Sequence, residues 1–284
     1  LIGVGASERL GDKSWIQIPF TSMTIQPAEF LKISFILTLA AHLFAVREQI
    51  NQPLHVLALC IHGAFPILLI HVQGDDGTAL VFAFIFIGMV FAAGISWKYI
   101  LAAVLAAAAA LPVLWFFVLS DFQKQRFLVL FNPETANVQS DYYQQHWAKL
   151  VIGSGRIWGK GIFSSGHRYV PEAYNDFIFS FIGESLGFVG CLAVLAALTA
   201  LCIKILANTH YAEDLQGRLI CVGVFSMLTC QIVVNIGMCL SLVPVIGITL
   251  PFLSSGGSSV LTNYLALGLV LSVYMRNPKT IFGS

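Results

Sequence analysis

Long apolar runs separated by short polar connectors constrain this chain more than any other feature. A helix that crosses a membrane needs about 20 mostly apolar residues, and the runs are close to that length or longer. They cover residues 27–46, 54–72, 78–96, 98–120, 177–207, 218–243 and 258–275. The runs are continuous rather than alternating, which argues against a β-barrel. The sequence therefore predicts an all-α polytopic membrane protein with about seven spanning helices.

The composition supports the membrane class and excludes others. Only 10% of the residues are charged and 57% are hydrophobic, whereas soluble domains are about 25% charged. The net charge of +1 gives no basic field for nucleic acid. All six cysteines fall inside or beside apolar runs without the spacing of metal ligands. We interpret them as small core residues.

The connectors predict the orientation of the spans. If the run 27–46 passes from outside to inside, six cations of the short segments lie on the cytoplasmic side and two on the other, as the positive-inside rule requires. The six are Arg47, Lys98, Lys204, Arg218, Arg276 and Lys279, and the two are Arg9 and Lys13. The interval 121–176 then forms a large extracytoplasmic loop. We expect one transmembrane domain over 1–284 that includes this loop.

The interval 141–187 is the one long polar stretch, and it carries the candidate site. Asp176 stands where the loop meets an apolar helix that begins directly after it. One interpretation is a helix N-cap, for which Asn-Asp is typical. The other is a general base fixed at the membrane boundary, with partial burial favouring proton uptake. The two interpretations are compatible.

Cations in the same interval predict a phosphate site. They alternate with aromatic residues and with glycines that permit close backbone approach, which suits the phosphate of a lipid whose tail lies in the bilayer. These cations are Lys149, Arg156, Lys160 and Arg168. A solvated loop is the alternative. GSGRIWGKG lacks the spacing of a nucleotide-binding loop, so we reject nucleotide binding.

Three ionisable residues are expected inside apolar helices. Glu29 and Lys32 stand three residues apart on one helix face, which indicates either a structural ion pair or a functional site. Glu184 follows Asp176 by about two turns, is expected below the membrane surface, and needs a partner there.

Two connecting segments are expected to be irregular. Asp75 and Asp76 form a polar turn. The segment 244–259 is too rich in proline and glycine for a regular helix, so it must lie at the surface or line a cavity.

These motifs together resemble the SEDS family of shape, elongation, division and sporulation proteins, typified by RodA and FtsW. The matching stretches are QPAEFLKI, DDGTALV, QKQRFLVLFNPE, KLVIGSGRIWGKG, YVPEAYNDFIF, IGESLGFVG and PVIGITLPFLSSGGSS. They cover almost the whole chain in order. Family members usually have ten spanning helices, so we expect about three further spans before Leu1.

The resemblance implies a function and partners. Family members are peptidoglycan glycosyltransferases of the bacterial cytoplasmic membrane that polymerise lipid II, an undecaprenyl diphosphate-linked disaccharide peptide, for cell elongation or division. They work with a class B penicillin-binding protein and with elongasome or divisome proteins. The family's essential aspartate falls on Asp176, and other motif residues fall on Glu29, Lys32, Lys149 and Glu172.

We therefore expect Asp176 to deprotonate the acceptor hydroxyl. The leaving diphosphate would be stabilised by cations drawn from Arg126, Lys149, Arg156, Lys160 and Arg168, with a divalent cation, Mg²⁺ or Mn²⁺, as a further source of charge. No organic cofactor and no protein metal ligand are predicted. Two alternatives stay open. A lipid II flippase would use Glu29, Lys32 and Glu184 to line a polar path, and a structural scaffold would need no catalytic residue.

Overall fold

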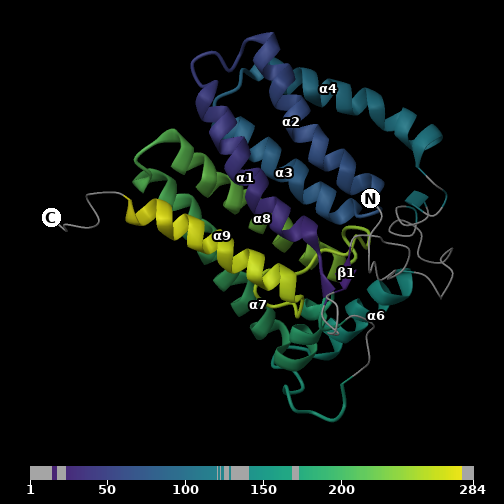
Figure 1. Cartoon of the computed structure of the whole chain (residues 1–284). Coiled ribbons are helices and arrows are strands. Elements are labelled where there is room, and N and C mark those ends of the chain that lie inside the picture. The colour runs from purple at the N-terminus through teal and green to yellow at the C-terminus, as the bar shows by residue number, and fades with distance from the viewer. Residues whose placement is uncertain are drawn as a thin grey trace. The chain divides into compact units, whose positions relative to one another are not determined.

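The computed structural model describes residues 15–17, 24–119, 121, 123–124, 128, 141–167 and 173–276. Figure 1 shows a chain built almost wholly of helices. They are α1 (Pro27–Ala45), α2 (Pro53–Val72), α3 (Asp76–Ala92), α4 (Trp97–Val113), the π-helix η1 (Leu114–Val118), α6 (Asp141–Ser154), α7 (Ile178–Ala207), the 3₁₀ helix η3 (Asn208–Tyr211), α8 (Leu215–Cys239) and α9 (Gly257–Met275). The strands β1 (Ile16–Gln17) and β2 (Thr24–Ile25) pair antiparallel, with Ile16 opposite Ile25.

The predicted class, an all-α polytopic membrane protein, is confirmed. Among the described residues, six helical stretches are long and apolar enough to cross a bilayer, and α3 is a shorter apolar helix of 17 residues. α8 ends at Cys239, four residues before the predicted boundary at 243, because an irregular segment begins there. The interval 121–176 is not simply a loop, since it contains α6.

One predicted span was wrong in its internal structure. Residues 177–207 were expected as a single helix, but α7 breaks at Gly187, whose φ of 68° and ψ of −165° are not helical. Only glycine adopts such angles without steric strain. Beyond the break, 188–207 is about 30 Å long at ~1.5 Å per residue, which matches the hydrocarbon core of a bilayer. Glu184 therefore lies in the part of α7 before the break, and its depth in the membrane stays a prediction.

The chain divides into two compact units. Unit 1 comprises Leu1–Gly94, Leu198–Ile232 and Pro251–Ser284, and unit 2 comprises Ile95–Ala197 and Val233–Leu250. In unit 1, α1, α2 and α3 lie side by side, and α1 also contacts α9 (Figure 1). Its core includes fully buried side chains at helical spacing on α1 and α3. They are Ile36, Leu39, Leu43, Phe82, Ile85 and Met89.

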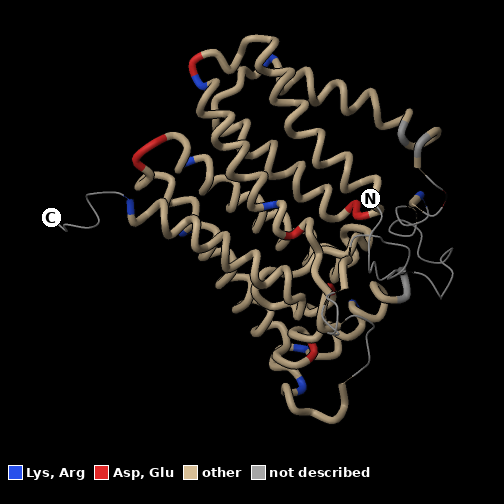
Figure 2. The backbone as a smooth tube through the Cα atoms, viewed as in Figure 1, with Lys and Arg blue, Asp and Glu red and all other residues tan. Residues whose placement is uncertain are grey.

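The helix starts of unit 1 follow local sequence rules. Proline occupies the first turn of α1 and of α2, where its missing N–H costs nothing. Asp75 caps α3 by accepting a hydrogen bond from the Thr78 N–H at 2.9 Å, and it also accepts one from Gln26 Nε2. The polar-turn interpretation of Asp75 is confirmed. Figure 2 shows charged residues mainly at such helix ends and turns.

We predict that the close approach of α8 to α1 and α3 depends on Gly223. A Cβ there would lie 2.8 Å from Ile36 Cγ2 and from Met89 Sδ. Gly223→Leu should lower the free energy of unfolding by about 1–3 kcal/mol through overpacking, measured as a lower melting temperature in detergent. Gly268→Leu on α9 is the matched control, since nothing lies within 4 Å of its Cβ position. Equal melting temperatures for the two variants would contradict the packing described.

Candidate functional site

Asp176 lies in unit 2, in the turn that leads into α7. The helix begins at Ile178, so Asp176 stands one residue before the N-cap position. Its side chain is half-buried, and Oδ2 faces Gly247, whose Cβ position is 3.7 Å away. Gly247 has φ of 65°, a left-handed conformation that favours glycine. The partly exposed Asp176 carboxylate thus lies beside the backbone of Gly247, which has no side chain.

Asn235 on α8 fixes the backbone of Asp176. Its Nδ2 group donates to the carbonyl oxygens of Asp176 at 2.7 Å and of Ile248 at 2.6 Å. An amide NH₂ carries two hydrogens, so one side chain can satisfy both carbonyls. Asn235 is fully buried. The turn before α7 and the segment after α8 are therefore joined through one buried amide.

The segment between α8 and α9 is irregular, as the sequence predicted. No helix or strand occurs between Cys239 and Gly257, and all of these residues are described. Irregular backbone at membrane depth needs donors for its carbonyls. Gln145 on α6 provides them at the start of the segment, because its buried Nε2 donates to Val243 O at 2.7 Å and to Met238 O at 3.3 Å.

The glycine-rich segment after α6 docks on the break in α7. Backbone N–H groups of Lys160 and Gly161 donate to the carbonyls of Glu184 and Ser185, both at 2.9 Å. In the other direction, Phe188 N donates to Arg156 O at 2.8 Å. The break at Gly187 frees these groups from intrahelical bonding, and the segment satisfies them. This explains why a helix break and a glycine-rich loop occur together.

Glu184 is buried and contacts two side chains of this segment and Ser154 at the end of α6. Oε1 accepts from Lys160 Nζ at 2.6 Å and from Ser154 Oγ at 3.4 Å, while Oε2 lies 3.1 Å from His167 Nδ1. The partner expected for Glu184 is thus confirmed. His167 Nε2 lies 3.2 Å from Ile162 O. Both ring nitrogens face acceptors, so the imidazolium form satisfies both contacts and a neutral ring satisfies one.

The predicted cations have different surroundings. Lys149 on α6 and Arg156 in the docked segment are exposed, and Arg156 has φ of 52°, uncommon for a residue with a Cβ. Lys160 is paired with Glu184 and its side chain is 29% exposed. Arg126, Arg168 and Glu172 lie outside the described residues. The role of each as a substrate ligand stays a prediction.

Glu29 and Lys32 belong to unit 1, where they form the expected ion pair. Lys32 Nζ lies 2.8 Å from Glu29 Oε1, with side chains 1% and 7% exposed. A buried pair of this kind costs desolvation energy for both ions, and removal of one partner leaves the other charge uncompensated. Glu29 Oε2 has no hydrogen-bond partner. The pair is structural in this geometry, and a role in catalysis stays a prediction.

Sequence reasoning indicated Asn235 as a hydrogen-bonding group beside the irregular segment 244–259, which its bond to Ile248 O confirms, but it missed the bond of Asn235 to Asp176 O and the roles of Gln145 and His167. Asn235 had a signal, because a polar side chain inside an apolar run requires a partner. Gln145 and His167 had none, since both lie in a polar interval where such residues are ordinary. Their partners come from distant parts of the chain.

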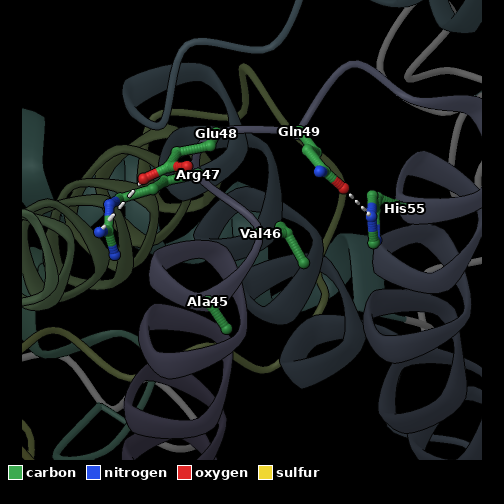
Figure 3. Close-up of a pocket in the computed structure, with 6 residues that line it drawn as sticks. All are labelled: Ala45, Val46, Arg47, Glu48, Gln49 and His55. Carbon is green, nitrogen blue, oxygen red and sulfur yellow. Dashed lines mark hydrogen bonds and ion pairs between the residues drawn. The ribbon is translucent and has the colours of Figure 1, made fainter.

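A pocket of about 290 Å³ lies at the α1–α2 turn, and none of the residues that line it is a predicted site residue (Figure 3). Arg47 Nη2 lies 3.6 Å from Glu48 Oε1, and Gln49 contacts His55. Arg47 also donates to Phe44 O and stacks on the Phe44 ring. These contacts occupy the polar groups among themselves, so we assign the pocket no function.

Comparison with known sequences gives one consistent family. A family model for FtsW, RodA and SpoVE, described as "Cell cycle protein", matches residues 1–279. The chain is 34% identical over 268 residues to the peptidoglycan glycosyltransferase MrdB of Escherichia coli, covering 93% of this chain and 71% of that protein. It is 32% identical to the probable peptidoglycan glycosyltransferase FtsW of Geobacter metallireducens, covering 98% and 73%.

Solved structures agree with the sequence comparison. A chain from a study of how a peptidoglycan synthase complex coordinates polymerization and crosslinking matches with a TM-score of 0.81 and 28% identity, covering 98% of this chain and 77% of that one. The rod shape determining protein RodA of Thermus thermophilus matches with a TM-score of 0.67 and 28% identity, covering 98% and 74%.

We predict that docking of the glycine-rich segment depends on Gly155. A Cβ there would overlap the carbonyl oxygen of Gly183, and backbone cannot move aside as a side chain can. Gly155→Ala should therefore displace the segment, increase its cleavage by a protease added to reconstituted vesicles, and lower the melting temperature. Gly153→Ala is the control, because nothing lies within 4 Å of its Cβ position. Identical protection of both variants would be inconsistent with the docked geometry.

We predict that loss of the Asn235 amide removes the donor at 2.7 Å from Asp176 O, which keeps the longer Cys239 Sγ contact at 3.9 Å, and the donor at 2.6 Å from Ile248 O. Asn235→Leu should cost about 1–3 kcal/mol for each unsatisfied group, measured by chemical unfolding in detergent. Gln231→Leu is the matched control on the same helix, because Gln231 is equally buried and its Oε1 already lacks a partner. Equal losses of stability in the two variants would show that the hydrogen bonds of Asn235 do not stabilise the fold.

Proposed function

This chain belongs to the FtsW/RodA/SpoVE family, and from that premise we propose that it is a peptidoglycan glycosyltransferase whose chemistry is centred on Asp176. It is a multi-pass protein of the cytoplasmic membrane. We infer that it polymerises lipid II into glycan strands on the side of the membrane that bears the interval 121–176. The observation that carries the assignment of Asp176 is its half-buried carboxylate, whose backbone is fixed by Asn235.

The reaction that we assign to this site is a glycosyl transfer. Asp176 accepts the proton of the acceptor sugar's 4-hydroxyl as that oxygen bonds to the anomeric carbon of the donor. The bond between the anomeric carbon and the diphosphate oxygen breaks, and undecaprenyl diphosphate leaves with the electron pair. The transition state has oxocarbenium character, as in other glycosyl chemistry. A positioned base contributes about 10²–10⁴ in rate.

Positive charge is needed where the diphosphate leaves. Lys149 on α6 and Arg156 on the docked segment are both exposed, which supports them as ligands of the diphosphate. Lys160 is paired with Glu184, so its ammonium group would have to bind the diphosphate while it keeps that ion pair. Arg126 and Arg168 complete the proposed set from outside the described residues. Apolar grooves between helices would bind the polyprenyl tails.

A divalent cation would have to be held by carboxylates, histidines or substrate oxygens. Within the described part of the chain, no three His, Cys, Asp or Glu side chains are grouped closely enough to hold a metal ion. Among the described residues, the donor set near Asp176 does not fit a protein-held metal, and we derive no step through one. Mg²⁺ or Mn²⁺ bound through the substrate diphosphate stays a proposal.

We propose that the functional partner is a class B penicillin-binding protein that crosslinks the new strands, within the elongation or division machinery. The solved chain from a peptidoglycan synthase complex supports this proposal. A transport function for lipid II is the second candidate. The buried Glu29–Lys32 pair favours transport, because charges inside a membrane often mark transport paths. Against this, the two charges are 2.8 Å apart and neutralise each other.

We predict that purified Asp176→Asn protein loses about 10²–10⁴ of its lipid II polymerisation rate and retains lipid II binding, because the amide keeps the size of the side chain and removes the base. Glycan strands are measured on gels with labelled lipid II. Asp214→Asn is the control, since Asp214 also precedes a helix, where it caps Gly217 N at 2.7 Å. A normal rate for Asp176→Asn would end the base assignment. Lipid II that crossed vesicles without polymerising would favour transport.

A further inference from the structure

The docked segment exposes an unusual set of large apolar side chains. Trp158 is 79% exposed and Phe163 is 99% exposed, and Ile157 and Ile162 are 59% and 51% exposed. The four lie within seven residues of one another in a polar interval. Isolated exposed apolar residues are ordinary, but a cluster of this size marks an interaction surface.

The backbone contacts place this cluster at the level where α7 enters the membrane. Phe188 N donates to Arg156 O at 2.8 Å and Val189 N donates to Ile157 O at 3.2 Å. Residue 188 begins the part of α7 that is about as long as the hydrocarbon core is thick. Taking residue 188 as the start of the span puts Arg156 and Ile157 level with the point where α7 would enter the acyl chains.

The segment is held in this place rather than free to fold back. Glu184 binds Lys160 and His167, so both ends of the turn that carries Ile162 and Phe163 are tied to α7. Gly159 and Gly161, with φ of 78° and 92°, allow the tight path between them. The apolar side chains are thus presented outwards by a fixed backbone.

We propose that Ile157, Trp158, Ile162 and Phe163 form an interfacial anchor that inserts into the leaflet on the loop side of the membrane. The residue chemistry suits this occupant. Tryptophan is enriched at the membrane interface, where its ring meets acyl chains and its N–H meets headgroups. The exposed Arg156 is adjacent in sequence and can bind the phosphates of anionic lipids. The anchor would keep the loop at the height of a lipid-borne substrate.

A docking site for a partner protein is the competing explanation. It also uses aromatic and arginine side chains, but it gives no reason for the cluster to lie level with the start of a membrane span. The depth of Trp158 in a bilayer free of partner protein separates the two. This measurement does not depend on glycosyltransferase activity, so it can fail while the proposed function stands.

The test uses the purified chain in vesicles of phosphatidylethanolamine and phosphatidylglycerol whose acyl chains carry bromine either near the headgroup or near the bilayer centre. The fluorescence of Trp158 is the difference between the unaltered protein and Trp158→Phe, a conservative change at an exposed position. We expect bromine near the headgroup to quench this difference at least about twofold more than central bromine, as for an interfacial residue, and aqueous iodide to have little effect.

Trp97→Phe supplies the matched comparison, because Trp97 is 68% exposed at the start of α4 and should report a second interfacial position. A nitroxide at Phe163→Cys gives an independent depth from its relative contact with oxygen and with a water-soluble nickel complex. Quenching of Trp158 by iodide but not by bromolipid would overturn the proposal. So would shielding of Trp158 that occurs only after a penicillin-binding protein is added.

Discussion

The arrangement of the site depends on one constraint, which is that every backbone carbonyl in an irregular segment near the membrane needs a donor. Two buried amides meet this need in unit 2. Asn235 serves the carbonyls of Asp176 and Ile248, and Gln145 serves those of Met238 and Val243. The same bonds that satisfy the irregular segment also hold the turn that carries Asp176. Structure and proposed chemistry therefore share these hydrogen bonds.

The break in α7 is the second element of this design. A continuous helix over 178–207 would exceed the thickness of the bilayer and would leave no free backbone groups for docking. Gly187 interrupts it, and the glycine-rich segment after α6 bonds to the freed N–H and carbonyl groups on both sides of the break. Glu184 then adds Lys160 and His167 to the same contact. The result is a segment bonded to both sides of the break, followed by a helical part of α7 about as long as a bilayer core is thick.

Some of this was predictable from the sequence. Spans follow from apolar length, because lipid leaves few other structures available, and the Glu29–Lys32 pair follows from spacing on one helix face. Proline and glycine correctly predicted the irregular segment after α8. The break at Gly187 was missed, because hydropathy depends on side chains and does not report the backbone conformation of one residue inside an apolar run. The partners of Asn235 and of Glu184 depend on tertiary contacts between residues far apart in sequence, which periodicity cannot supply.

The central claim is that the carboxylate of Asp176 is reached from the extracytoplasmic side of the membrane, to which the charge pattern of the sequence assigns the interval 121–176. Labelling of Asp176→Cys in intact spheroplasts with a membrane-impermeant maleimide tests it most directly, with the unaltered chain as background for the six native cysteines. The account predicts labelling of this variant without permeabilisation. Labelling only after the membrane is opened, or none by any water-soluble reagent, would contradict it.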